Sequence, residues 1–370
     1  MRGKIKVLHV LGTFMDGGTE RLMMDILSRI DKERFEVTAC SPSVNCKPDV
    51  VEKFRAKGIG THLFKENPGP GLILSMRKYI SEGHFDIIHT HHYTWNILGR
   101  IASILAGVPN ILTYNHNWPG MEKTRHRVLF RFLNRWTKKN IVVSEAVRGY
   151  FMDVVGISPD KVVKISNGID LDIFSPPAEE TKIDMRKELN IPLNAFIVGF
   201  AGRLIDWKRP DIFIRTASLL ARVDPNMYFI VAGDGEKKKE LERMAEELAL
   251  NGKIAFLGWR SDMHRIYKAL DVLMVLSEEG FGLVSAEGMA TELPIVALDN
   301  TINREVIGND AAIFSELEPG KLAYNIRLLS ENESLRKMLG LAGRKKSESD
   351  HDIRKTAQQL AEIYEEVLNR

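Results

Sequence analysis

The sequence predicts an α/β protein of two doubly wound domains, each built on a parallel sheet that helices cover. Short apolar runs alternate with amphipathic segments along nearly the whole chain, which is the pattern of parallel strands joined by crossover helices. The alternation stops at Ser175-Pro176-Pro177, which reads as a linker, and then restarts. The chain has 370 residues, more than a single domain usually contains. We therefore expect one domain over 1–174 and a second over 175–350.

The first half begins with an apolar strand that runs into a glycine turn. Thr19 follows Gly17 and Gly18 and is expected to cap a helix. Strand, glycine turn and helix start form a geometry in which a phosphate can approach the backbone, although the dinucleotide pattern G-x-G-x-x-G is missing. The strands of this half are expected at 5–12, 35–40, 59–64, 85–89, 109–113, 141–144 and 162–165. Further helices are expected at 49–57, 72–82 and 97–106.

The second half repeats the alternation without repeating the sequence. Its strands are expected at 196–201, 227–232, 254–257, 272–276 and 294–297. Its helices are expected at 210–221, 236–250, from Leu283 onward, and at 319–330 and 334–346, with a final helix at 353–368.

Composition narrows the class of protein. The chain carries 52 basic and 49 acidic residues, for a net charge of +3, so global charge gives no case for nucleic-acid binding. Two cysteines, Cys40 and Cys46, fit unpaired thiols in a cytosolic protein. No apolar run approaches the ~18 residues of a membrane span. The basic and apolar start of the chain reads as a first strand and not as a signal peptide.

An anion-binding arrangement is predicted in the second half. The apolar run 272–276 is followed by a loop with Gly280 and Gly282 and then by a helix from Leu283. Such a loop aims free backbone amides and the positive end of a helix at an anion. Arg203 and Lys208, after another strand, would add positive charge. Glu279 and Glu287 would repel a phosphate but can accept hydrogen bonds from sugar hydroxyls. The combination indicates a nucleotide-sugar ligand.

These residues resemble the signature of the family 4 retaining glycosyltransferases, which have the GT-B fold. Glu279 and Glu287 with Gly280-Phe281-Gly282 between them resemble the family's donor motif, and Gly202-Arg203-Leu204 with Lys208 resembles its diphosphate clamp. Other matches follow in order along most of the chain: Gly17-Gly18-Thr19-Glu20-Arg21, Asn167-Gly168-Ile169-Asp170 and Ala232-Gly233-Asp234-Gly235.

The resemblance implies two Rossmann-like domains that face each other across a cleft, with the C-terminal helix, 351–370, packing back on the first. It implies that His116, Arg203, Lys208 and Glu279 serve catalysis, and that Glu287 holds the ribose. The remaining donor contacts implied are Gly17, Gly18, Phe281, Gly282 and Leu283, with Trp259 and Arg260 on the side of the base. Because Arg203 and Lys208 take the place of a metal, neither a metal nor a cofactor is expected. Retaining members are thought to let the leaving phosphate accept the acceptor's proton, so no nucleophile is named.

The sequence departs from the family pattern after the donor motif. Glu292-Leu293 precedes Pro294 where a glycine is usual, and Thr301-Ile302-Asn303-Arg304 replaces a usual glycine pair. We expect this second segment to be a loop near the sugar or the diphosphate, which leaves the identity of the donor open.

Histidines gather at the ends of two expected strands. His89, His91 and His92 follow one strand and His116 follows the next, at the sheet edge where such folds bind ligands. A zinc site is an alternative, but cysteine or carboxylate partners at ligand spacing are missing. By resemblance His116 corresponds to a histidine near the donor sugar. The other three either line the acceptor cleft or only satisfy backbone groups.

The segment 122–139 carries seven basic residues against one acidic residue. Val128, Leu129, Phe132, Leu133 and Trp136 fall at helical spacings and are expected to form one face of a helix. A basic amphipathic helix can lie on an anionic membrane. The alternative is that the apolar face packs on the sheet and the charges are solvated.

The sequence thus predicts a cytosolic, metal-independent glycosyltransferase, peripheral on the membrane if the basic segment binds lipid. It would move a hexose with retention from a nucleotide diphosphate-sugar, expected to be a UDP-sugar, to a saccharide or lipid-linked acceptor in surface polysaccharide or glycolipid synthesis. A nucleotide-sugar epimerase on the same fold and a catalytically silent nucleotide-sugar-binding scaffold are the alternatives.

Overall fold

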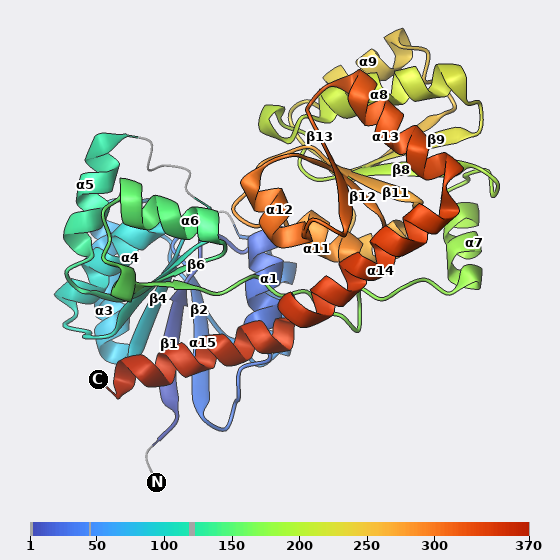
Figure 1. The fold of residues 1–370 in the computed structure, drawn as a ribbon. Helices are drawn as coiled ribbons and strands as arrows, with labels where there is room; N and C mark the ends of the chain where they lie inside the picture. Colours follow the sequence, from blue (N-terminus) through green and yellow to red (C-terminus); the bar gives the residue numbers. More distant parts are fainter. Residues whose placement is uncertain (1–2, 44–45, 118–122, 370) are drawn as a thin grey trace. The chain divides into compact units, whose positions relative to one another are not determined.

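The computed structural model describes residues 3–43, 46–117 and 123–369 and divides into two compact units. Unit 1 comprises Met1–Gly168 and Ile353–Arg370, and unit 2 comprises Ile169–Asp352 (Figure 1). The chain therefore changes unit a few residues before the expected boundary at 174. The proline linker and the helix α7 that follows it belong to unit 2.

Unit 1 is built on a seven-stranded parallel sheet with the order β3-β2-β1-β4-β5-β6-β7. Its strands are β1 Ile5–Val10, β2 Phe35–Ser41, β3 Gly60–Leu63, β4 Ile87–His91, β5 Ile111–Asn115, β6 Thr137–Val142 and β7 Val162–Lys164. Its helices are α1 Gly18–Leu27, α2 Pro48–Ala56, α3 Pro70–Gly83, α4 Tyr93–Leu105, α5 Thr124–Leu133, α6 Glu145–Gly149 and α15 Ile353–Leu368, with the short turns Tyr150–Val154 and Pro159–Lys161. The core of the unit includes Leu8, Val10, Ile88 and Ala102.

Unit 2 is built on a six-stranded parallel sheet with the order β10-β9-β8-β11-β12-β13. Its strands are β8 Phe196–Ala201, β9 Met227–Ala232, β10 Ile254–Gly258, β11 Val272–Val275, β12 Ile295–Leu298 and β13 Ala312–Ser315. Its helices are α7 Glu179–Glu188, α8 Pro210–Val223, α9 Lys238–Glu247, α10 Met263–Ala269, α11 Leu283–Ala290, α12 Thr301–Ile307, α13 Pro319–Glu331 and α14 Glu333–Asp350, with a 3-10 turn at Asp206–Lys208. The core gathers Val198, Phe200, Phe229 and Val272.

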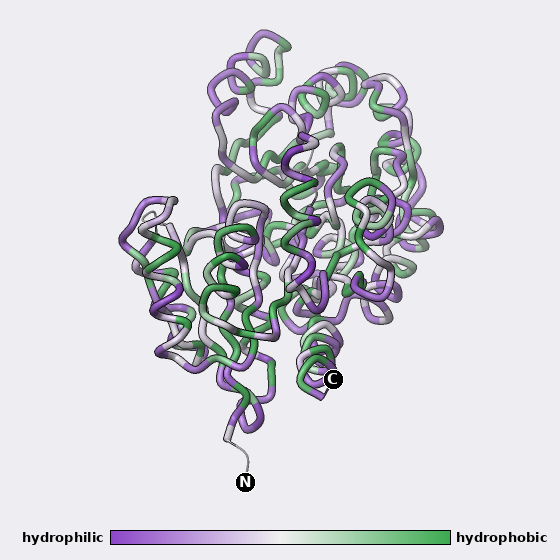
Figure 2. The backbone as a smooth tube through the Cα atoms, turned by 90° about the vertical axis from the view of Figure 1, so that its left-hand side faces the viewer, coloured by the Kyte–Doolittle hydropathy of each residue, from purple (hydrophilic) through white to green (hydrophobic). Residues whose placement is uncertain are grey.

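Both sheets have the doubly wound topology that the sequence predicts. In each sheet the first three strands follow one another toward one edge, and the fourth strand then pairs with the free side of the first. β1 therefore pairs with β4, and β8 pairs with β11. Along the helices the backbone tube alternates between hydrophobic and hydrophilic residues, as expected for helices with one buried face (Figure 2). Ligands of such sheets bind outside the carboxyl ends of the strands at this switch point. The fold therefore fixes one candidate place for chemistry in each unit.

Three local expectations differ from the structure. Thr19 does not cap α1, because the helix begins at Gly18 with Gly17 as its N-cap residue. The segment 301–304 is not a loop, because Asn300 accepts a hydrogen bond from the amide of Asn303 and starts helix α12. His91 lies inside β4 and not after it.

The basic segment 122–139 is not one helix. Glu122 lies outside the described residues, α5 ends at Leu133, and Thr137 begins strand β6. Lys139 is buried and pairs with Glu366 at 3.4 Å, so its charge does not belong to a surface patch. Among the described helices, none is both long and apolar enough to cross a membrane.

A substitution at Gly340 tests how closely α14 packs against the backbone at Glu292. A side chain at this position would collide with the backbone carbonyl oxygen of Glu292. We expect Gly340→Ala to lower the free energy of unfolding by about 1–3 kcal/mol, because backbone cannot move aside as a flexible side chain can. Gly320→Ala is the control, since its new methyl group would meet only the Glu318 carboxylate at 3.7 Å. Urea denaturation of the two variants checks this, and equal midpoints would contradict it.

Candidate active site

The candidate site of unit 2 lies at the carboxyl ends of β8 and β11. These neighbouring strands pair in parallel, with Val272 opposite Val198 and Met274 opposite Phe200. The loop from Gly202 to Lys208 follows β8, and the loop from Leu276 to Gly282 follows β11. Because parallel strands end at the same edge, the two loops meet although about 70 residues separate them.

Glycines let the loop after β8 approach the loop after β9. Gly202 and Gly233 have φ angles of +143° and +148°, which residues other than glycine rarely adopt. A side chain at Gly233 would also collide with the carbonyl oxygen of Gly202. Backbone hydrogen bonds from Gly202 to Ala232 (3.0 Å) and from Leu204 to Asp234 (2.9 Å) fix the two loops together. The backbone around Gly202 and Arg203 is therefore fixed by its hydrogen bonds to the loop after β9.

Lys208 is the central cation of the site. It lies in the 3-10 turn, is 7% exposed, and forms an ion pair with Glu279. Ser277 also donates a hydrogen bond to Glu279, with Oγ and Oε1 3.1 Å apart. Burial, followed by the nearby Arg203, lowers the pKa of Lys208 to about 7, since both disfavour the charged form. The carboxylate of Glu279 favours the charged form and keeps the ammonium in place.

Arg203 and Trp207 lie beside this ion pair. The Arg203 side chain is exposed, and its guanidinium carbon is 5.9 Å from the centre of the Trp207 ring. The Lys208 ammonium is 4.8 Å from the same ring. Both cations can therefore interact with one indole, which orients them without neutralising them.

The third part of the site is the start of α11. Gly282 is its N-cap residue with φ +78°, and the first turn begins at Leu283. The first amides of a helix have no partner within the helix and attract anions. Ser285 lies in the same turn, is 1% exposed, and its hydroxyl has no partner among the described residues. Phe281 contributes only backbone here, because its ring packs against His351.

Glu287 lies one turn further along α11. It accepts a hydrogen bond of 2.8 Å from the hydroxyl of Tyr267, which belongs to α10. This bond orients the carboxylate, and nothing in the sequence indicated Tyr267 because the two residues are 20 positions apart on different helices.

Asn303 of helix α12 holds the loop that carries Glu279 through hydrogen bonds to the backbone. Its side-chain amide donates to the carbonyl of Ser277 at 3.3 Å and to that of Leu298 at 2.8 Å. The segment that departs from the family pattern therefore holds the loop that carries Glu279. Sequence reasoning missed this role because it treated the segment as a loop.

Trp259 and Arg260 follow β10, an outer strand of the sheet. Trp259 is 50% exposed. Arg260 donates two hydrogen bonds to Asp262, of 2.8 and 2.7 Å, which occupy its guanidinium. A contact of these residues with a base stays a prediction.

Gly17, Gly18 and His116 belong to unit 1. Gly17 and Gly18 begin α1, where the Glu20 carboxylate folds back against Gly17 and accepts a hydrogen bond of 2.8 Å from Thr13. His116 follows β5, is half-buried, and lies beside Tyr114 with ring centres 4.5 Å apart and the two rings tilted by 32°.

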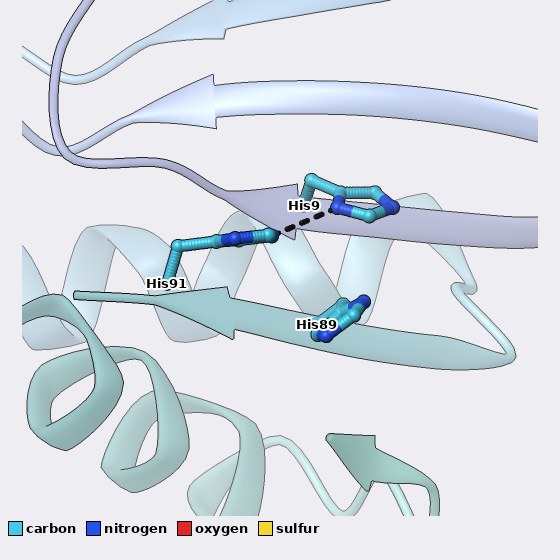
Figure 3. Close-up of side chains that lie close together, drawn as sticks. All are labelled: His9, His89 and His91. Carbon is cyan, nitrogen blue, oxygen red and sulfur yellow. Dashed lines mark hydrogen bonds between the residues drawn. The ribbon is translucent and has the colours of Figure 1, made fainter. Parts of the chain in front are cut away.

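Histidines also surround the switch point of unit 1. His9 on β1 and His89 and His91 on β4 are all 0% exposed, and Figure 3 shows them gathered across the two strands. Burial lowers the pKa of His9 to about 3 and those of the other two well below the usual value, so the rings are neutral at pH 7. Neutral imidazoles are what a metal requires. One nitrogen from each ring lies within 4.8 Å of the others. His9 Nδ1 and His91 Nε2 share a hydrogen bond of 3.0 Å, which occupies one nitrogen on each of these two rings.

Comparison with known proteins identifies the family. The family described as Glycosyl transferases group 1 matches residues 181–346, and Glycosyltransferase Family 4 matches residues 16–173. A D-inositol 3-phosphate glycosyltransferase of Corynebacterium glutamicum is 30% identical over 323 residues, which cover 77% of this chain and 76% of the relative. The chain belongs to the family 4 glycosyltransferases. It is therefore a nucleotide-sugar-dependent glycosyltransferase, as the sequence predicted.

Two further relatives of this glycosyltransferase are informative. The UDP-Gal:alpha-D-GlcNAc-diphosphoundecaprenol alpha-1,3-galactosyltransferase of Escherichia coli is 27% identical over 324 residues, or 83% of this chain and 82% of the relative. The crystal structure of HepE from Anabaena in complex with UDP-glucose matches with a TM-score of 0.87 at 24% identity and covers 98% of this chain and 100% of that one. The second likeness confirms the predicted GT-B class of fold.

The protonation of Lys208 is directly testable. We expect its ammonium to titrate around pH 7, against ~10.4 for an ordinary lysine. The cation is present below pH 7 and is lost as the pH rises through 7. Nuclear magnetic resonance of labelled lysine side chains measures this, with the Lys208→Arg variant for assignment. Glu279→Gln should lower the pKa further, because it removes the neighbouring negative charge. A Lys208 signal that titrates only above about pH 9 would contradict the prediction.

Proposed function

We propose that this glycosyltransferase moves a hexose, with retention, from a UDP-sugar to a saccharide or lipid-linked acceptor. The contact of Lys208 with Glu279 beside Arg203 and the start of α11 is the observation that carries the proposal. UDP-glucose in the Anabaena structure and UDP-Gal in the name of the E. coli relative support the uridine donor.

The diphosphate would bind between the two cations and the helix start. Arg203 would donate two hydrogen bonds to its oxygens and Lys208 would add a point charge. The amides of Phe281, Gly282 and Leu283 would complete the site, and the Ser285 hydroxyl would gain the partner that it lacks. Negative charge grows on the diphosphate as the bond to the sugar breaks, so charge placed there in advance stabilises the transition state.

Donor binding would exchange the partners of Lys208. A diphosphate competes with Glu279 for the ammonium, and a carboxylate released in this way can accept hydrogen bonds from hydroxyls of the donor sugar. Glu287, oriented by Tyr267, would hold the ribose. Gly17, Gly18 and His116 would contact the donor from unit 1, and Trp259 and Arg260 would lie near the base. These roles require neither a metal nor a protein nucleophile.

The acceptor would be lipid-linked and the pathway one of surface polysaccharide or glycolipid synthesis. The name of the E. coli relative includes a diphosphoundecaprenol-linked sugar. This supports an acceptor held at a membrane, and the protein would work at its cytoplasmic face.

The donor-site variants test this function. Arg203→Ala and Lys208→Ala are expected to lower acceptor-dependent release of UDP about 100-fold or more, because each removes charge at the leaving group. Glu287→Gln should mainly weaken donor binding, measured by calorimetry with UDP-, GDP- and ADP-sugars. Arg222→Ala, an exposed arginine of α8 outside the site, is the control. Isomerised donor without acceptor would indicate an epimerase, and donor binding without turnover a scaffold.

We also propose that α5 and the residues after it contact anionic lipid. Val128, Leu129, Phe132 and Trp136 are 62%, 37%, 48% and 43% exposed, so the alternative that this whole face packs on the sheet does not hold. Phe130 and Leu133 are the helix residues that are buried. Arg125, Arg131, Arg135 and Lys138 of the same segment are exposed as well. Exposed apolar groups and exposed cations in one segment match the chemistry of an anionic membrane surface.

Vesicle sedimentation tests the lipid contact. The double variant Arg125→Glu and Arg131→Glu is expected to bind anionic vesicles at least about tenfold more weakly, since each basic residue contributes about 1 kcal/mol at such a surface. Arg77→Glu with Lys78→Glu, on the exposed side of α3, makes the same change in net charge and serves as the control. Equal binding of the parent protein to neutral and anionic vesicles would end the proposal.

A further inference from the structure

The loop that leads into helix α11 is tied at both of its ends to other parts of unit 2. This donor loop, residues 276–282, lies between β11 and α11. Near its start, the side-chain amide of Asn303 donates a hydrogen bond of 3.3 Å to the carbonyl of Ser277. Near its end, the ring of Phe281 meets the ring of His351 edge to face, with ring centres 5.1 Å apart and an angle of 89° between the planes. Both rings belong to residues that are 3% exposed.

Hydrogen bonds hold His351 in this position. Its Nε2 is 2.9 Å from the carbonyl oxygen of Val306, and since a carbonyl can only accept, Nε2 donates. Val306 lies in the last turn of α12, where carbonyls have no partner within the helix. The backbone of His351 is fixed as well, because its amide donates to Ser347 at 2.9 Å and its carbonyl accepts from the amide of Ile169 at 2.6 Å. The imidazole is therefore a fixed surface for Phe281.

The two ties of the donor loop meet in helix α12. Asn303 and Val306 both belong to α12, and His351 is the residue that ends α14. Helix α11 packs against both of these helices (Figure 1). The contacts thus form a closed circuit that runs from the loop to α12, from α12 to His351, and from His351 back to the loop through Phe281.

This circuit matters because the end of the donor loop has a flexible residue. Gly282 follows Phe281 directly and has a φ of +78°, and a glycine lets the backbone turn at little steric cost. The direction of the amides at 281–283 therefore depends on how firmly the neighbouring side chain is anchored. In unit 2 that anchor is the ring of Phe281 against His351.

We propose that His351 is a positioning residue for the diphosphate of the donor. It acts through the Phe281 ring, which holds the backbone amides of 281–283 in the direction that a diphosphate requires, and it does not act by contact with the donor. The diphosphate rests on the proposed function, whereas the anchoring of the loop is a property of the ligand-free protein.

Calorimetry with UDP tests the proposal. His351→Gln keeps a donor for the carbonyl of Val306 but removes the ring, and we expect it to bind UDP about three- to tenfold more weakly, the effect of losing one aromatic pair. His351→Phe keeps a ring beside Phe281 and should stay within about twofold of the parent protein. Gly340→Ala is the control for general destabilisation of unit 2, and it should bind UDP as the parent does below its unfolding transition.

Phe281→Leu approaches the same contact from the other side. It should lose about as much UDP affinity as His351→Gln, and the double variant should lose little more than either single variant, because both remove one contact. If His351→Gln does not fold, Phe281→Leu carries the test. Unchanged UDP affinity in the two single variants, losses that multiply in the double variant, or an equal loss in Gly340→Ala would overturn the proposal.

Hydrogen exchange of the ligand-free protein separates this inference from the proposed function. In His351→Gln the backbone amides of 276–283 should exchange faster than in the parent, while those of the loop 202–208 should not change. Unchanged exchange at 276–283 would refute the anchoring by His351. A parent protein that shows this anchoring but binds no UDP would refute the proposed donor instead.

Discussion

The contact between Lys208 and Glu279 is the interaction on which the candidate donor site depends. A lysine that is 7% exposed would be costly without a partner. Its partner is available only because β8 and β11 are neighbours at the switch point of the sheet. The doubly wound topology thus creates the pair, and the pair holds Lys208 at the carboxyl edge of the sheet, where we propose that the diphosphate binds. Glycines at 202 and 233 matter for the same reason, since they let the supporting loops meet.

Much of the fold was readable from the sequence because strands buried on both faces are continuous apolar runs. Strands 196–201 and 227–232 and helix 353–368 agree with the structure to the residue. The prediction of a single basic helix over 122–139 was wrong, since α5 ends at Leu133 and β6 begins at Thr137. Helical spacing of its apolar residues does not require that they are buried, and Lys139 looks like a surface charge until its partner Glu366 is known. Contacts of this range leave no local pattern in a sequence.

The same limit applies to the candidate site. Motif residues identified the loops that carry Arg203, Lys208 and Glu279, since glycines and charges after strands are visible locally. The residues that orient them were not visible. Tyr267 holds Glu287 and Asn303 holds the Glu279 loop, each across more than one element. Ser285 was passed over because a small residue in a helix gives no signal unless its burial and its missing partner are known.

The two switch points differ in their electrostatics, and this difference suits a transferase. In unit 2 the buried group is a cation balanced by a carboxylate, so its charge can respond to an anionic donor. In unit 1 burial keeps four imidazoles neutral, and hydrogen bonds hold these rings in place. Tyr364 joins two of the rings, His9 and His89, through its hydroxyl, although 355 residues separate it from His9. The C-terminal helix therefore does more than cover the first sheet, because the Tyr364 hydroxyl that it carries links His9 on β1 to His89 on β4.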